Sequence, residues 1–279
     1  MPAQTPPTAF FDYDGTLIEG DSILYWQRYY YARRPLMRVF QIANCVGLVL
    51  LASRIINSHM LKRVFLWPLV FEKPEALDAL ARGFVRGDLS FRFHGPVLAR
   101  LWAHHRLGHG SVVISASGTF YLKYLAEFFP PDTVLLGTQM DLNNLAGGIL
   151  RFPRYRDGNL RGANKIRRLR ALGYAAAGSG GFAYSDHHHD IPLLEFVSHP
   201  NCIRPTAKLE KYAEERSWPI WEGGHWPRSR AKWKLKLEAL CLLLFAAAPK
   251  FLAATPEPSL PADAAIEEQV RQLSAGIPG

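Results

Sequence analysis

Short apolar segments alternate with helical stretches along this chain, and that alternation is typical of a parallel α/β sheet. The strand-like segments lie at residues 8–14, 111–117, 132–138, 181–186 and 201–205. Short apolar runs without polar alternation are typical of strands buried on both faces. The sequence therefore predicts a doubly wound, Rossmann-like α/β fold.

One long helical segment interrupts the alternation after the first strand. Residues 21–92 show apolar and basic stretches with few strand signals, and we expect them to form a smaller helical cap over the sheet. The catalytic core would then comprise residues 8–20 and 93–225. Residues 226–254 are predicted to form a basic and apolar helix, and the Pro/Ala/Glu-rich residues 255–279 a disordered tail.

Two shorter patterns lie between the predicted strands of the core. Asn-Asn and Gly-Gly pairs separate apolar runs in residues 140–152, which predicts a hairpin. Residues 164–173 are basic and end in a glycine, as a short helix does. Both patterns fit a connection between neighbouring strands.

Charge and cysteine content narrow the class of protein. The 279 residues carry a formal charge of +9, which favours anionic partners such as phosphorylated metabolites, an acidic membrane surface or nucleic acid. The three cysteines are odd in number and lack CxxC spacing, so neither a disulfide framework nor a zinc site is indicated. The N-terminus has no signal-peptide pattern, and we expect a cytoplasmic protein.

Two uncharged apolar stretches, residues 39–53 and 239–249, raise the question of a membrane. Both are shorter than the roughly 20 apolar residues that a spanning helix needs. Amphipathic helices of this length can still lie on a membrane surface. We therefore expect no spanning helix and leave open a peripheral contact with the inner face of the cytoplasmic membrane.

Polar residues stand at or just beyond the carboxyl ends of the predicted strands. In an open parallel sheet these ends share one edge, and ligands bind there. The side chains at this edge would be those of Asp12, Asp14, Ser115, Asp186 and Asp190, with Lys165 at the start of a helix. The sequence thus predicts one site that combines carboxylates, a hydroxyl and an ammonium group.

This set of side chains suits phosphoryl transfer. Carboxylates in close quarters disfavour each other's ionisation, so we expect a hard cation among them, and Mg²⁺ prefers oxygen ligands. A lysine and a serine offer a phosphate group a point charge and a hydrogen-bond donor. An aspartate nucleophile beside such a site predicts an aspartyl-phosphate intermediate.

The same motifs resemble those of the haloacid dehalogenase (HAD) superfamily, and in detail its subfamily IB phosphatases. The resemblance spans residues 8–221 and rests on FFDYDGTL, VVISAS, GANKIRRL and YSDHHHDIPLLEFV, in that order. It implies a magnesium-dependent phosphomonoesterase with a helical cap inserted into a Rossmann-like core. Mg²⁺ would be its cofactor.

The resemblance also implies a role for each matching residue. Asp12 would be the nucleophile, and Asp14 would protonate the leaving group and then activate water. Ser115 and Lys165 would bind the transferring phosphoryl group. Asp12, Asp14 and Asp186 would form the Mg²⁺ site. Asp190 would either support this site or position Lys165. Gly15 and Thr16 would shape the turn.

Several of these assignments have rivals in the sequence itself. Ser117 lies two residues beyond Ser115 and could take its role, although Ser115 ends the apolar run directly. Lys165 could instead belong to a solvated basic helix face. His187–His189 are interpreted as loop residues, because three consecutive side chains do not easily converge on one ion.

Two readings of the cap compete for the substrate. In related phosphoserine phosphatases an acidic residue at the position of Asp21 recognises the amine of the substrate, and Asp21 could do so here. The alternative structural role for Asp21 is the N-cap of a helix. The sequence supports both roles equally.

The second reading is a phospholipid headgroup such as that of phosphatidylglycerophosphate. Residues 24–55 combine aromatic side chains, arginines and a long apolar stretch, and they are similar to the cap of phosphatidylglycerophosphatase C, a subfamily IB relative. A basic and apolar pattern recurs in residues 228–245. Packing of both segments against the protein itself is the competing explanation.

Two other classes of function are a non-catalytic binding module and a nucleic-acid-binding protein. A non-catalytic module that binds phosphate or lipid could use the same fold, but the intact Asp12 and Asp14 argue against it. Nucleic acid is not an expected partner, because only the basic charge favours it and no recognition module is present.

Overall fold

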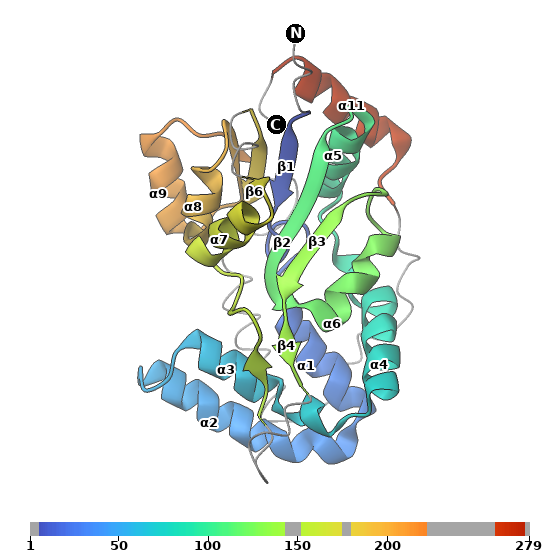
Figure 1. Cartoon of the computed structure of the whole chain (residues 1–279), viewed down its shortest axis with the longest axis vertical. Helices are drawn as coiled ribbons and strands as arrows, with labels where there is room; N and C mark the ends of the chain where they lie inside the picture. Colours follow the sequence, from blue (N-terminus) through green and yellow to red (C-terminus); the bar gives the residue numbers. More distant parts are fainter. Residues whose placement is uncertain (1–5, 143–151, 175–179, 222–259, 277–279) are drawn as a thin grey trace.

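The protein is described by a computed structural model that covers residues 6–142, 152–174, 180–221 and 260–276. The predicted helix over residues 226–254 lies outside these ranges. Within them the chain forms two parts, a β-sheet flanked by helices and a set of helices below its edge (Figure 1).

The central sheet has six parallel strands in the order β3-β2-β1-β6-β7-β8. Its strands are β1 (Thr8–Phe11), β2 (Gly110–Gly118), β3 (Val134–Thr138), β6 (Phe182–Ser185), β7 (His199–Ile203) and β8 (Ile220–Trp221). Because β1 lies in the middle, chain order runs outward from it in both directions, as in a doubly wound fold. The predicted α/β class is confirmed, and β8 is a strand that the sequence pattern did not reveal.

Helices cover both faces of this sheet. Side chains alternate along β1, so Phe10 packs against the helices on one face of the sheet and Phe11 packs against those on the other face. The Phe10 face is covered by α7 (Ala163–Ala171), α8 (Ile191–Leu194) and α9 (Ala207–Glu215), and the Phe11 face by α5 (Gly95–Arg106), α6 (Thr119–Leu122) and η4 (Lys123–Glu127). The apolar runs of β1 and β2 are therefore buried on both sides, which explains why they lack alternation, whereas β3 at the edge of the sheet is partly exposed.

A helical insert separates β1 from α5 in the sequence. It contains α1 (Ser22–Arg33), η1 (Pro35–Val39), α2 (Phe40–Ala52), α3 (Ser58–Phe65), η2 (Trp67–Phe71), α4 (Pro74–Gly87) and η3 (Leu89–Arg92). The segments that lead into and out of it are bonded to each other, because Glu19 N donates to Arg92 O at 2.9 Å and His94 N to Leu17 O at 2.8 Å. In Figure 1 the insert lies beyond the carboxyl ends of β1 and β2.

An aromatic cluster joins the insert to the sheet. The ring of Trp26 lies 5.2 Å from that of Phe84 and 5.0 Å from that of Phe120, both edge to face. Trp26 is fully buried, and such pairs add about 1 kcal/mol each beyond the area they bury. This packing fixes α1 directly beneath the end of β2.

The predicted hairpin is present as a short antiparallel pair. β4 (Met140–Asp141) pairs with β5 (Arg154–Tyr155), and the residues between 143 and 151 lie outside the described ranges. The second strand of the pair therefore begins two residues beyond the predicted segment, which ended at 152. The helix predicted over 164–173 is α7, and it is followed by Gly173 at a φ of +85°.

The prediction of a disordered tail over residues 255–279 is wrong for residues 263–274. Residues Asp263–Ser274 form α11, which packs on α5 through Ile266. Ile266, Val270 and Leu273 follow one another at helical spacing and present one apolar face. The prediction of disorder rested on the Pro/Ala/Glu content and did not take this short apolar repeat into account.

Candidate active site

The loop after β1 brings the first two carboxylates to the edge of the sheet. Asp12 N donates to Tyr184 O at 2.9 Å, so the strand continues to Asp12 and leaves its side chain at the carboxyl end. Gly15 has a φ of +81°, a conformation that side chains rarely adopt. The chain turns sharply there, and Asp14 consequently faces the same space as Asp12.

Lys165 lies between two aspartates at the centre of this space. Its Nζ donates to Asp12 Oδ1 at 2.7 Å and to Asp190 Oδ2 at 2.6 Å, and all three side chains are buried. Ser185 Oγ donates to the same Asp190 oxygen at 2.9 Å. The lysine therefore joins residues that are 153 and 25 positions away in the sequence into one cluster.

In this cluster, burial and charge pairing shift the pKa values of the side chains in opposite directions. Burial raises the pKa of Asp12 well above its ordinary value, Lys165 lowers it, and the charges of Asp190 and Asp186 raise it further. Burial alone would lower the pKa of Lys165, but Asp12 and Asp190 more than offset it and the net shift is upward. Pairing with the two aspartates thus favours the charged form of Lys165, whereas burial and the neighbouring carboxylates disfavour the charged form of Asp12.

Asp186 lies directly against the turn that carries Asp14. A side-chain carbon on Gly15 would come within 2.6 Å of Asp186 Cγ, so only glycine leaves room for that carboxylate. The backbone of Asp186 is held by Thr206 N, which donates to its carbonyl oxygen at 2.8 Å. The described carboxylates outnumber the single buried lysine, and their oxygens form a donor set that a hard cation such as Mg²⁺ prefers.

Both candidate serines of β2 face Asp14. Ser115 Oγ lies 3.4 Å from Asp14 Oδ2, and Ser117 Oγ donates to the same oxygen more closely. Ser117 N donates to Ser115 Oγ at 2.9 Å. The pairing of β2 with β3 is irregular between Ile114 and Gly118, and such irregularities re-aim side chains. Both hydroxyls therefore lie on the same side of the site and contact Asp14.

Asp21 performs the structural role that the sequence allowed. Its Oδ1 accepts a hydrogen bond from Ile23 N at 3.0 Å and caps α1. The residue is exposed at the surface, and desolvation by the surrounding protein together with the charge of Asp14 raises the pKa of Asp21 to about 6. A carboxylate at the rim of the site is thereby left facing Asp14.

Lys62 and Ser22 also reach the site, and the sequence motifs did not indicate either. Lys62, on α3, donates to the carbonyl of Ala116 and is close enough to Asp21 and Asp14 for their charges to raise its pKa, although burial lowers it overall. Ser22 N donates to Asp14 Oδ1 at 2.7 Å. Ser22 stands beside the singled-out Asp21, whereas Lys62 belongs to no motif and reaches the site only through packing of the insert.

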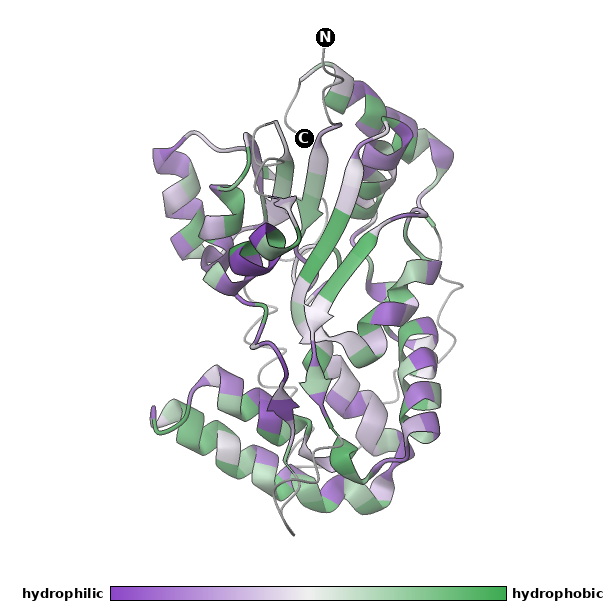
Figure 2. Ribbon diagram, in the orientation of Figure 1, coloured by the Kyte–Doolittle hydropathy of each residue, from purple (hydrophilic) through white to green (hydrophobic). Residues whose placement is uncertain are grey.

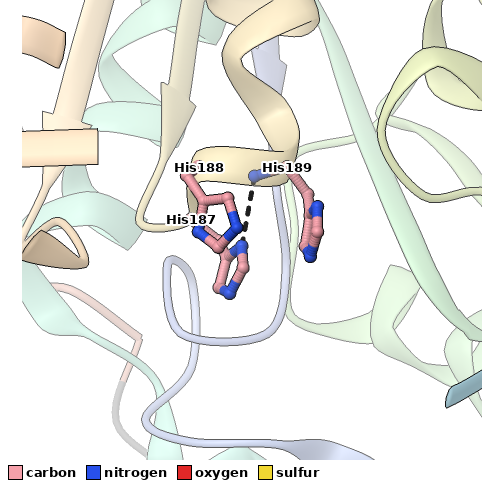
Figure 3. A group of neighbouring side chains, drawn as sticks. All are labelled: His187, His188 and His189. Carbon is pink, nitrogen blue, oxygen red and sulfur yellow. Dashed lines mark hydrogen bonds between the residues drawn. The ribbon is translucent and has the colours of Figure 1, made fainter. Parts of the chain in front are cut away.

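His187, His188 and His189 form a compact group beside Asp186 and Asp190 (Figure 3). Their rings lie 4.2–4.6 Å apart, and their ligand atoms lie within 4.8 Å of one another. One ring nitrogen is already used, because His189 N donates to His187 Nδ1 at 3.2 Å. Burial and the charges of nearby arginine and lysine residues lower the pKa of His188 and His189. The same positive charges disfavour a metal ion at the three rings.

Comparison with known sequences matches residues 9–195 to a family described as haloacid dehalogenase-like hydrolase. A histidinol-phosphatase of Neisseria meningitidis serogroup C is 26% identical over 229 residues, which cover 76% of this chain and 96% of that protein.

Comparison with solved structures shows the same fold. A protein of unknown function from Bordetella pertussis Tohama I has a TM-score of 0.64 at 21% identity, covering 78% of this chain and 99% of that one. A phospho-aspartyl intermediate analogue of phosphoserine phosphatase has a TM-score of 0.52 at 12% identity, covering 83% of this chain and 99% of that one.

Proposed function

Because the chain belongs to the haloacid dehalogenase-like hydrolase family, we propose that it is a magnesium-dependent phosphomonoesterase that acts through an aspartyl-phosphate. The observation that carries this proposal is the position of Lys165, whose buried ammonium group lies 2.7 Å from Asp12 and 2.6 Å from Asp190. A phosphate bound at this point would meet a cation directly beside a carboxylate nucleophile.

The reaction follows from the placement of the two aspartates. An Asp12 oxygen attacks phosphorus, the bond from phosphorus to the ester oxygen breaks, and Asp14 gives the leaving alkoxide a proton. Water then attacks the aspartyl-phosphate, Asp14 takes a proton from that water, and inorganic phosphate leaves. Lys165 and Ser115 hold the phosphoryl oxygens throughout and offset their charge.

The donors present suit a magnesium ion. Oxygens of Asp12, Asp14 and Asp186 would hold it, and the absence of a side chain at Gly15 leaves space for the Asp186 carboxylate beside the loop. When bound, Mg²⁺ would supply positive charge to the transferring phosphoryl group. Asp190 is engaged by Lys165 and Ser185, which supports a role in positioning Lys165.

The rim of the site favours a small phosphate ester whose alcohol part carries an amine. Asp21 places a carboxylate there, and Lys62 lies close to it. Phosphoserine and histidinol phosphate both have this chemistry, and the similarity to a histidinol-phosphatase supports the second. An amine would add to the positive charge of Lys62 in offsetting the like charges of Asp21 and Asp14.

A phospholipid headgroup, such as that of phosphatidylglycerophosphate, is the second candidate. The observation that favours it is the exposed apolar surface of the insert, where Leu36 is 90% and Ile42 is 68% exposed. A lipid substrate would be presented at such a surface.

The experiment is a hydrolysis assay of the purified protein with phosphoserine, histidinol phosphate, sugar phosphates and phosphatidylglycerophosphate in detergent. We expect the Asp12→Asn variant to lose turnover by at least about 10⁴-fold and the Asp157→Asn variant, altered at an exposed aspartate, to keep it. Chelation by EDTA should remove activity and added Mg²⁺ restore it. Activity of the Asp12→Asn variant, or full activity in EDTA, would refute the mechanism.

A further inference from the structure

The outer side of η1 and α2 is an extended apolar surface. The exposed side chains are those of Leu36, Val39, Ile42, Val46, Val49 and Ile55, and we call this set the α2 face. Its members recur every three or four residues over α2, so they share one side of the helix. Figure 2 shows α2 coloured as predominantly hydrophobic. A contiguous exposed patch of this kind marks a surface that meets a partner.

The opposite side of α2 is packed and cannot be part of that surface. Asn44 is fully buried and donates to Gln27 Oε1 at 2.9 Å and to Tyr31 Oη at 3.1 Å. Gly47 lies against α3, where a side-chain carbon would come within 3.0 Å of Leu61 Cδ1. In Figure 1, α3 accordingly lies between α2 and the sheet. The α2 face therefore points away from the catalytic core.

Among the described residues, Pro35–Ala52 is the helical segment whose 18 residues and mean hydropathy of 1.6 would permit a membrane span. The buried hydrogen bonds of Asn44 argue against that arrangement. Pulling α2 into a bilayer core would separate Asn44 from Gln27 and Tyr31 and leave the side-chain amide of Asn44 without these partners. A helix that keeps these bonds could meet a membrane only along its surface.

The chain segment that carries the α2 face has basic but no acidic residues, although Arg28 pairs with Asp88 at 2.9 Å and Lys62 reaches the catalytic site. No acidic residue occurs between Asp21 and Glu72, whereas this interval contains Arg28, Arg33, Arg34, Arg38, Arg54, Lys62 and Arg63. Glu72 itself is occupied, since it accepts hydrogen bonds from Arg34 at 2.8 Å and Tyr30 at 2.9 Å. Arg33 and Arg54 are exposed at the two ends of the face. The partner must therefore offer apolar surface bordered by negative charge.

We propose that the α2 face docks on the surface of an anionic lipid bilayer. Acyl chains meet the apolar side chains, and anionic headgroups meet the arginines at both ends. Pairing with a second copy of the chain is disfavoured, because a two-fold interface would bring Arg33, Arg38 and Arg54 against their own copies with no acidic residue to neutralise them. The proposal holds for either substrate class and goes beyond the phosphatase activity.

The test is co-sedimentation of the full chain with vesicles of phosphatidylcholine alone and of phosphatidylcholine mixed with phosphatidylglycerol. We expect binding to the mixed vesicles that weakens with added salt. The variant I42S/V46S/V49S should lose this binding, and Arg54→Glu should weaken it at least about tenfold. The matched control is L172S/L260S, which removes exposed apolar side chains from other places and should bind as the wild type does.

Several results would overturn the proposal. They are absence of binding to the mixed vesicles, equal binding by I42S/V46S/V49S, or equal loss in L172S/L260S. Sedimentation equilibrium without lipid should show the same molar mass for wild type and I42S/V46S/V49S; a dimer that dissociates in the variant would assign the face to a second copy.

A soluble aryl phosphate separates this inference from the proposed function. Because the α2 face lies away from the catalytic residues, I42S/V46S/V49S should hydrolyse such a substrate at the wild-type rate if the protein is a phosphatase. Vesicle binding by the Asp12→Asn variant should likewise equal that of the wild type. A loss of either measurement alone therefore shows which of the two proposals has failed.

Discussion

Asp12 is a buried carboxylate whose surroundings act on its pKa in opposite directions. Burial, Asp190 and Asp186 raise the pKa, while Lys165 lowers it. Carboxylates with strongly perturbed pKa values are common at functional sites. If the proposed function holds, Mg²⁺ bound beside Asp12 would favour the charged form of this carboxylate.

Asp21 makes a pH-dependent contribution to stability that can be measured directly. Its pKa rises from an ordinary 3.8 to about 6, so between these values the folded chain holds a proton that the unfolded chain has lost. Stability conferred by this proton falls as pH rises through that window. Asp21→Asn removes the effect and keeps the N-cap of α1, because asparagine caps helices equally well.

We expect Asp21→Asn in EDTA to melt about 1–2 °C above the wild type at about pH 7 and level with it below about pH 4, the small size reflecting the exposure of the side chain. Thermal unfolding followed by circular dichroism at both pH values measures this. A difference that is the same at both pH values would show that the effect of the substitution is unrelated to titration of Asp21.

Sequence reasoning could find the residues that end strands, because strand polarity places them at one edge. Asp12, Asp14 and Ser115 come directly after or within apolar runs, and the structure gathers them as expected. It favoured Ser115 over Ser117, whereas in the structure both hydroxyls contact Asp14, since the strand pairing is irregular after Ile114. Lys62 was not found, since its distance from Asp14 depends on how the insert packs.

At the scale of elements, the hydrogen bonds of Asn44 hold α2 against α1. Asn44 donates to Gln27 and Tyr31, and Gln27 Nε2 in turn donates to Phe65 O at 2.6 Å. This buried chain of amides connects α1, α2 and the end of α3. A polar network of this kind fixes the relative position of helices whose remaining contacts are apolar and tolerant of sliding.

Replacing Asn44 by alanine should therefore destabilise the protein. Gln27 Oε1 and Tyr31 Oη would lose a buried donor, which costs about 1–3 kcal/mol in the free energy of unfolding. Urea denaturation measures the change, with Ser53→Ala at the exposed end of α2 as the control that should stay within about 0.5 kcal/mol of wild type. Equal stability of the two variants would mean that this network does not hold α2.

At the end of the molecule opposite the site, α11 packs against α5. In Figure 1, α11 lies beside α5, far along the chain from it. Arg106, on α5, pairs with Asp263 at 2.5 Å and with Glu267 at 2.6 Å, and Ile266 is 4% exposed against Ala99 and Ala103. The sequence-based prediction missed α11 because a short helix is stabilised mainly by the surface it packs on.

Ile266→Ala should lower the free energy of unfolding by about 2 kcal/mol, because it empties part of the contact with α5. The exposed neighbour Glu268 provides the control, and Glu268→Ala should leave the stability close to that of wild type. Catalytic activity should persist in both, since α11 lies at the far end of the sheet. Unchanged stability of Ile266→Ala in urea denaturation would show that α11 does not dock on α5 in solution.

The central claim is that Asp12 carries the phosphoryl group during turnover. It is tested most directly by acid quenching of the enzyme in the presence of substrate, reduction with borohydride and mass spectrometry of the peptide that contains residues 8–17. An acyl phosphate at Asp12 is reduced to homoserine, and this account predicts homoserine at position 12, with aspartate retained at position 14. Unmodified Asp12 during steady turnover, or homoserine at Asp14 alone, would contradict it.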